Sequence, residues 1–159
     1  MFKNKIILYI YSISKQPVKF TVLLEANQLF NEGMKIDGSI LGFRIKLGRA
    51  YIVFLLLTHI IIVPVAFAFH NLFTLLDCHA SIILTMFFTA LLFGVFSFFK
   101  KWARDAITQQ RIKAAWAIQF PFFPYETYHK EINNIFEQAL AEGISKKNLE
   151  TFILDKLSN

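Results

Sequence analysis

Two long stretches of hydrophobic residues dominate the middle of this chain, and charged positions are absent from both. They run from Ala50 to Phe69 and from Ala80 to Phe99. A helix of about 20 residues rises about 30 Å, which matches the hydrocarbon core of a bilayer. The pattern therefore predicts two membrane-spanning helices, and the short loop at residues 70–79 makes them antiparallel neighbours. The expected fold class is an all-α membrane protein built on a two-helix transmembrane hairpin.

An amphipathic segment precedes the hairpin. The spacing of apolar residues predicts a helix from Gln16 to Met34, with Pro17 in its first turn and Gly33 at its C-terminal cap. The Asp37-Gly38-Ser39 sequence then predicts a turn, with Ser39 as the N-cap of the helix that enters the membrane. The first twelve residues are rich in β-forming side chains, and the pattern leaves a strand and a short interfacial helix equally open.

The chain after the second span is also predicted to be helical. The helix continues over Lys101 to Ile118, Pro124 opens a further helix that Gly143 closes, and Ser145 caps the last one. The last two helices are too short to bury a core alone, so their apolar faces must meet another part of the chain or a partner. We thus expect an N-terminal amphipathic segment (1–48), a transmembrane hairpin (49–99) and a helical tail (100–159).

The distribution of charge predicts the orientation of the hairpin. The net charge is +6, and the Lys and Arg residues gather just outside the two spans, whereas residues 70–79 contain none. This is the positive-inside pattern, which places both termini in the cytoplasm of a bacterial-type inner (plasma) membrane. Because topology accounts for the basic residues, we expect no nucleic-acid partner.

An aromatic linker follows the long helix. It reads Phe120-Pro121-Phe122-Phe123-Pro124-Tyr125, and its prolines stop the helix and stiffen the chain. This many aromatic residues are unusual in a solvated linker. We therefore expect them to be buried or covered by a partner. The residues expected to bind a partner, here and in the tail, are Phe120, Phe122, Phe123, Phe136 and Phe152.

His59 is the one ionisable residue near the middle of a predicted span, where such a group is costly. Ser81, Thr85 and Thr89 form a polar stripe on one face of the second span, and Thr89 lies at the depth of His59. The favoured interpretation is a hydrogen bond between His59 and Thr89; a contact to another subunit, or a proton or ion site, is the alternative. The phenylalanines of the second span are expected to face lipid or another subunit: Phe87, Phe88, Phe93, Phe96, Phe98 and Phe99.

Other chemistry is weakly indicated. His70, Asp77, Cys78 and His79 are metal-ligand types, but adjacent Asp-Cys-His is not a usual zinc spacing, so they are expected to be polar caps. His129 is expected to be solvated on an exposed helix face. We find no phosphate-binding glycine loop and no nucleophile–histidine–acid pattern. We therefore expect neither an enzyme, nor a bound metal, nor a cofactor.

These features favour a non-enzymatic two-pass membrane subunit. The hairpin would anchor it, and its cytoplasmic ends would scaffold a larger assembly, such as a secretion, motor or transport complex. Its partners would be the lipid bilayer and other subunits, or further copies of itself. The alternative is a small oligomeric transporter or channel component in which His59 and the Ser/Thr stripe line a polar path.

Overall fold

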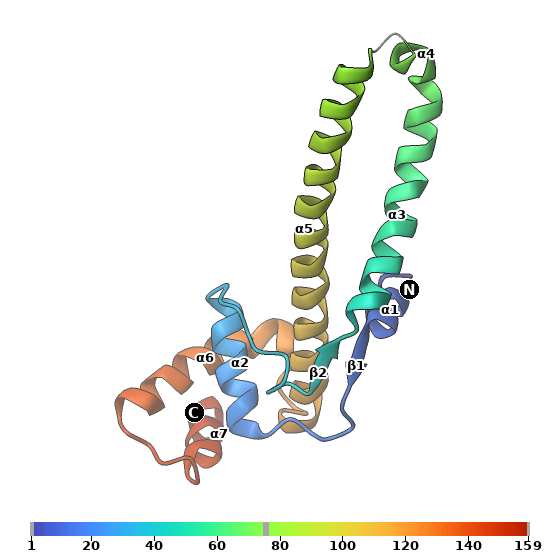
Figure 1. Ribbon diagram of the computed structural model, residues 1–159. Helices are drawn as coiled ribbons and strands as arrows, with labels where there is room; N and C mark the ends of the chain where they lie inside the picture. Colours follow the sequence, from blue (N-terminus) through green and yellow to red (C-terminus); the bar gives the residue numbers. More distant parts are fainter. Residues whose placement is uncertain (1, 75–76, 159) are drawn as a thin grey trace. The chain divides into compact units, whose positions relative to one another are not determined.

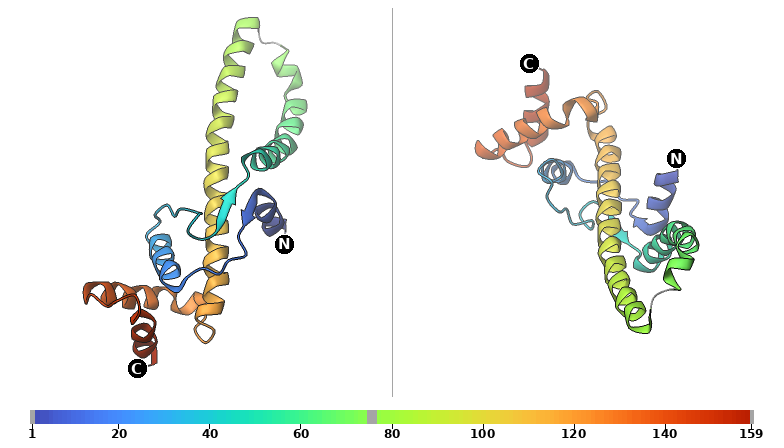
Figure 2. Two further views of the ribbon diagram at one scale, coloured as in Figure 1. Left: turned by 60° about the horizontal axis from the view of Figure 1, so that its bottom comes forward. Right: turned by 90° about the horizontal axis from the view of Figure 1, so that it is seen from above.

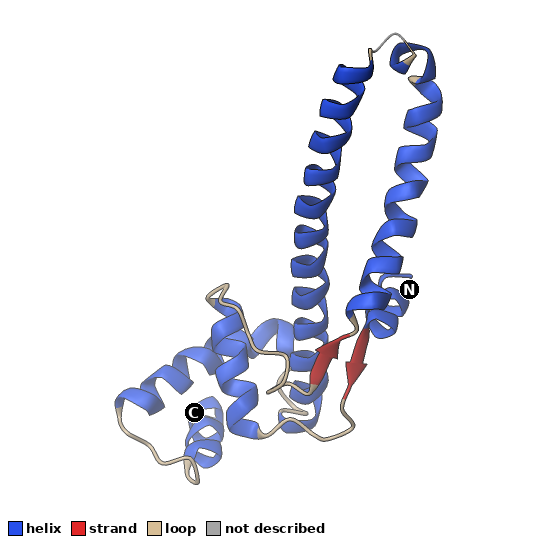
Figure 3. Ribbon diagram, in the orientation of Figure 1, coloured by secondary structure: helices blue, strands red, loops and turns tan. Residues whose placement is uncertain are grey.

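The computed structural model describes residues 2–74 and 77–158 and is mostly helical. The predominance of helix is as expected, although a short two-stranded sheet is also present (Figure 3). The elements, labelled in Figure 1, are α1 (Phe2–Ile10), β1 (Tyr11–Ile13), α2 (Phe20–Asn31), β2 (Phe43–Ile45), α3 (Leu47–Ala68), α4 (His70–Phe73), α5 (Cys78–Gln119), α6 (Tyr125–Ala141) and α7 (Leu149–Ser158).

The chain folds as two compact units, each assembled from an early and a late segment. Unit 1 combines Met1–Ser12 with Ile45–Asp105, and unit 2 combines Ile13–Arg44 with Ala106–Asn159. The 42-residue helix α5 contributes residues to both units. The units are described separately below.

Unit 1 contains two helices that are long and apolar enough to cross a membrane, α3 and α5. In the most apolar window of α3 only 11% of residues are buried, and in that of α5 none are. A core helix of a soluble domain would bury its apolar side chains, whereas these helices leave theirs exposed. Asp77 caps α5, because its carboxylate accepts a hydrogen bond from the Ala80 N–H at 2.7 Å.

The N-terminus resolves the choice left open by the sequence, because it forms a helix and then a strand. The helix α1 buries Ile7 and Ile10 completely and packs on α3. The strands β1 and β2 pair in antiparallel fashion: the Ser14 N–H donates to Gly42 O at 2.7 Å, and the Lys46 N–H donates to Ile10 O at 2.8 Å.

The expected helix start at Ser39 is wrong. Ser39 instead lies in a turn, where its N–H donates to the Asp37 carboxylate at 2.9 Å. Gly42 follows with a φ of +71°, a left-handed conformation that interrupts a helix. The chain therefore continues as β2, and α3 begins only at Leu47.

Unit 2 is a small helical module in which α6 contacts both α2 and α7 (Figure 2). The helix α2 begins at Phe20, later than predicted, because Lys19 is still extended with a ψ of 149° and Pro17 lies outside the helix. Both predicted glycine caps are confirmed. Gly33 (φ +69°) and Gly143 (φ +70°) each end a helix in a Schellman motif, with paired N–H donors returning to the last turn.

The C-terminal helix also begins later than predicted. Ser145 lies one turn before α7, and its carbonyl accepts only the Asn148 N–H, at 2.9 Å. The first helical bond of α7 instead runs from the Phe152 N–H to Asn148 O, so Asn148 occupies the capping position. The apolar face of α6 is confirmed at Ile132, Ile135, Phe136 and Ala139, whereas Leu140 is 56% exposed.

Candidate functional site

An aromatic cluster joins α3 to α5 within unit 1. Phe54 of α3 lies 5.1 Å from Phe96 and 5.7 Å from Phe99, measured between ring centroids, and Tyr51 meets Phe96 edge-on at 5.6 Å. Trp102 extends the cluster, with its ring 5.9 Å from that of Phe99. The expectation that Phe96 and Phe99 face lipid or another subunit is therefore wrong, because they contact α3 of their own chain.

Helical geometry explains this correction. Phe96 follows Thr85 by 11 residues, which is about three turns at 3.6 residues per turn, so both lie on one face. The predicted hydroxyl stripe and part of the phenylalanine set thus share the face that meets α3. Phe87 and Phe98 lie on the opposite face and are 67% and 75% exposed.

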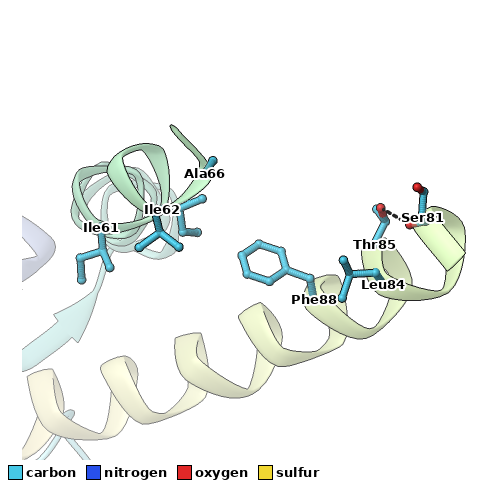
Figure 4. Close-up of a pocket in the computed structure, with 8 residues that line it drawn as sticks. Ile61, Ile62, Ala66, Ser81, Leu84, Thr85 and Phe88 are labelled. Carbon is cyan, nitrogen blue, oxygen red and sulfur yellow. Dashed lines mark hydrogen bonds between the residues drawn. The ribbon is translucent and has the colours of Figure 1, made fainter. Parts of the chain in front are cut away.

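A largely apolar cavity of about 600 Å³ lies between α3 and α5 (Figure 4). The Phe88 side chain extends from α5 toward Ile62 of α3. Ser81 and Thr85 supply hydroxyl groups to the lining, and the Thr85 hydroxyl donates to Ser81 O at 2.8 Å. Its remaining lining is apolar, so the cavity suits a hydrocarbon chain better than a polar solute.

The three polar residues singled out in the two apolar helices, His59, Thr85 and Thr89, bond to their own helices. His59 Nδ1 lies 2.7 Å from Leu55 O, and the Thr89 hydroxyl donates to Thr85 O at 2.8 Å. Thr89 lines a small cavity of about 90 Å³ together with Tyr51 and other residues of both helices, but His59 lies outside the lining of both cavities. The structure thus brings the hydroxyl stripe to α3 and leaves His59 exposed on another part of that helix.

The aromatic linker is divided into a buried part and an exposed part. Phe120 is 2% exposed, and its ring lies 4.7 Å from that of Trp116 and 5.3 Å from that of Phe20. The Trp116 Nε1–H donates to Phe123 O at 2.7 Å, which fixes the linker against α5. Phe122 points away from these contacts and is 87% exposed.

The remaining residues expected to bind a partner differ in the same way. Phe136 is 3% exposed and belongs to the core of unit 2, whereas Phe123 and Phe152 are half-buried. Phe123 meets Tyr128 edge-on at 5.2 Å. Of the predicted set, Phe122 therefore has the largest exposed fraction, and Ile118, four residues earlier, is 70% exposed.

Sequence reasoning missed a buried polar cluster between α2 and α6. Asn27 is 1% exposed, and its Nδ2–H donates to His129 O at 2.9 Å. The atoms Asn27 Oδ1, His129 Nδ1 and Asn133 Oδ1 are buried without a hydrogen-bond partner. The expected solvated position of His129 is thus wrong, because its ring also stacks on Tyr125 at 4.8 Å. The signal available was the i, i+4 spacing of His129 and Asn133 on one helix face.

One exposed ion pair ties α5 to α6 inside unit 2. Lys113 Nζ lies 2.6 Å from a Glu126 carboxylate oxygen. The hydrogen bond from Lys113 lowers the pKa of Glu126 below its usual value, whereas burial raises the pKa of Tyr125. Among the described residues, no group of three or more His, Cys, Asp or Glu side chains is placed to hold a metal ion.

Comparison with known proteins gives no match. No family model fits the chain, and no curated protein or solved structure is significantly similar to it.

Proposed function

We propose that this chain is a two-pass membrane subunit that anchors a larger assembly through unit 2. In this proposal α3 and the first half of α5 form a transmembrane hairpin, and both termini lie in the cytoplasm of a bacterial-type inner membrane. The observation that carries the proposal is Phe122, an 87% exposed aromatic side chain on a folded module. The basic residues outside the two spans support the orientation.

The linker holds Phe122 in a fixed position. Pro121 and Pro124 restrict the backbone, the Phe123 N–H donates to Phe120 O at 3.2 Å, and the indole of Trp116 anchors Phe123. A backbone that is already ordered at the binding residue loses less entropy on binding. Burial of a phenylalanine contributes about 1.5–3 kcal/mol, so Phe122 is suited to be an anchor for a partner subunit.

The alternative of a polar transport path has less support. His59 bonds to its own helix and lies outside the cavity between α3 and α5, and the hydroxyls of Thr85 and Thr89 are also satisfied locally. A path for ions requires polar groups that are free to bind them. We therefore favour the scaffold.

The proposal is tested with two variants of the full chain. One carries Phe122→Ala, and the other carries a photo-crosslinking residue in place of Phe122. We expect Phe122→Ala to reduce copurification of partner subunits in mild detergent at least about tenfold, as for an interface anchor. Leu140→Ala is the matched control, because Leu140 is an exposed apolar residue on α6. Recovery of the chain alone, as a defined oligomer with no crosslinked partner, would contradict the scaffold and favour the alternative.

A further inference from the structure

One end of the apolar helices in unit 1 carries a dense cluster of positive charge. Unit 1 contains two acids, of which Asp77 caps the far end of α5 and Asp105 lies 3.4 Å from Arg104. The chain thus concentrates cations at this end and leaves them almost uncompensated. We call them the basic cluster: Lys3, Lys5, Lys46, Arg49, Lys100, Lys101 and Arg104.

The basic cluster is assembled by α1, which brings the first residues of the chain to the ends of α3 and α5. Lys3 of α1 lies over the Trp102 ring of α5, with Nζ 5.5 Å from the ring centroid. Arg49 of α3 lies over the Tyr9 ring of α1 at 5.0 Å, and its guanidinium donates to Tyr9 O at 3.4 Å. Cations from three helices therefore converge, although about 100 residues separate the first from the last.

Exposed apolar side chains accompany these cations. Leu8, Tyr9 and Trp102 are 56%, 48% and 43% exposed. Aromatic residues at the end of an apolar span lie at the level of the lipid headgroups, and an amphipathic helix beside them lies in the interface. A ligand at this level is adjacent both to water and to hydrocarbon.

We propose that the basic cluster binds the headgroup of an anionic phospholipid, whose phosphate is contacted by Lys and Arg side chains of the cluster. Basic pockets between membrane helices on the cytoplasmic side are suited to such headgroups. Arg and Lys donate charge-assisted hydrogen bonds to phosphate, and the neighbouring aromatic and aliphatic side chains contact the glycerol and upper acyl chains. This inference rests on the membrane insertion assumed in the proposed function.

The test measures lipid retention by the purified full chain. The protein in a neutral detergent is titrated with phosphatidylglycerol and, separately, with phosphatidylcholine, and the bound lipids are counted by native mass spectrometry. We expect a clear preference for phosphatidylglycerol. The variant Lys3→Gln with Lys5→Gln removes two exposed charges of α1 and should weaken phosphatidylglycerol binding about 25-fold, at about fivefold per charge.

The matched control is Lys146→Gln with Lys147→Gln, which makes the same charge change on exposed lysines of unit 2. If the control variant retains as much phosphatidylglycerol as the wild-type chain, the result supports a site on unit 1. The inference would be overturned if both variants lost the same amount of bound phosphatidylglycerol. It would also be overturned if the wild-type chain retained phosphatidylglycerol and phosphatidylcholine equally. Competition by soluble glycerophosphoglycerol at the same concentration as the lipid would also overturn it, because the ligand would then be a free phosphate compound.

Alkaline extraction of membranes separates this inference from the proposed function. If the wild-type chain is released by alkali, the membrane subunit itself is contradicted. If the chain stays in the membrane but shows no lipid preference, only the headgroup site is contradicted.

Discussion

The two units differ in the burial of their apolar side chains. In unit 1 the most apolar window of α5 buries none of its residues, and Phe87 and Phe98 project outward. In unit 2 the apolar residues of the helices meet one another, and Leu23, Ile132 and Ile153 are almost fully buried. The difference shows that a helix rich in apolar residues does not by itself form a buried core. Whether those residues are buried depends on what surrounds the helix.

Polar groups show the same contrast. In unit 1 the hydroxyls of Thr58, Thr85 and Thr89 donate to carbonyls four residues earlier on their own helix. In unit 2 polar side chains reach distant segments, as when Arg111 donates to Leu41 O at 2.9 Å. Local bonding of the hydroxyls is what helices require if they span a membrane, as we propose for α3 and α5.

The largest effect on the difference between the units is expected from placing charge on the outward face of α5. Phe87→Arg with Leu91→Arg should raise the cost of membrane insertion by about 5–7 kcal/mol, because each Arg near the middle of a span costs about 2.5–3.5 kcal/mol. The measurement is the fraction of the chain released from membranes by alkali.

The control places the same charges on unit 2, as Gln138→Arg with Ala141→Arg, both of which are exposed positions of α6. We expect no release there, because exposed substitutions away from special features change stability by about 0.5 kcal/mol or less. Full retention of the Phe87 variant would show that this part of α5 lies outside lipid.

The two tryptophans differ in burial between the two units. Trp116 is 1% exposed in unit 2, whereas Trp102 in unit 1 is 43% exposed. Trp116→Ala should lower the free energy of unfolding of unit 2 by about 3–5 kcal/mol, because it removes the contact to Phe120 and the bond to Phe123 O. Limited proteolysis of the detergent-purified chain should then cleave residues 106–159 rapidly. Trp102→Ala should leave that region resistant, and similar cleavage of both variants would refute the contrast.

The smallest expected effect concerns the buried tyrosine of unit 1. Burial raises the pKa of Tyr11 to about 12, with Arg104 opposing and Asp105 reinforcing the shift. Because the folded pKa exceeds the unfolded value of 10.0, this tyrosine stabilises the fold below pH 10 and loses that contribution between about pH 10 and 12. The loss is on the order of 2 kcal/mol. In an ultraviolet titration, the phenolate step near pH 12 should lose the amplitude of one tyrosine in Tyr11→Phe and keep it in Tyr9→Phe; an unchanged amplitude in Tyr11→Phe would contradict the assignment.

Local chemistry predicted much of the fold. The two apolar runs, the continuation of the second helix past Lys101, and the caps at Gly33 and Gly143 depend on neighbouring residues alone. The paired strands could not be predicted, because each is three residues long and its partner lies about 30 residues away.

The candidate site was predicted less well. The sequence indicated that the linker aromatics needed covering, but it did not distinguish buried Phe120 from exposed Phe122, which are two residues apart. The contact between Phe54 and Phe96 follows from helical periodicity only once the register of the two helices is known. The buried position of Asn27 against His129 required knowing that α2 packs on α6.

The discontinuous construction of unit 2 sets an order of events during synthesis. Asn27 and His129 bond across 102 residues, and both apolar helices are encoded between them. At about 5–20 residues per second, the ribosome needs roughly 5–20 seconds to make this stretch, during which α2 has no α6 to cover its apolar face. Unit 2 can therefore be completed only after both apolar helices have left the ribosome.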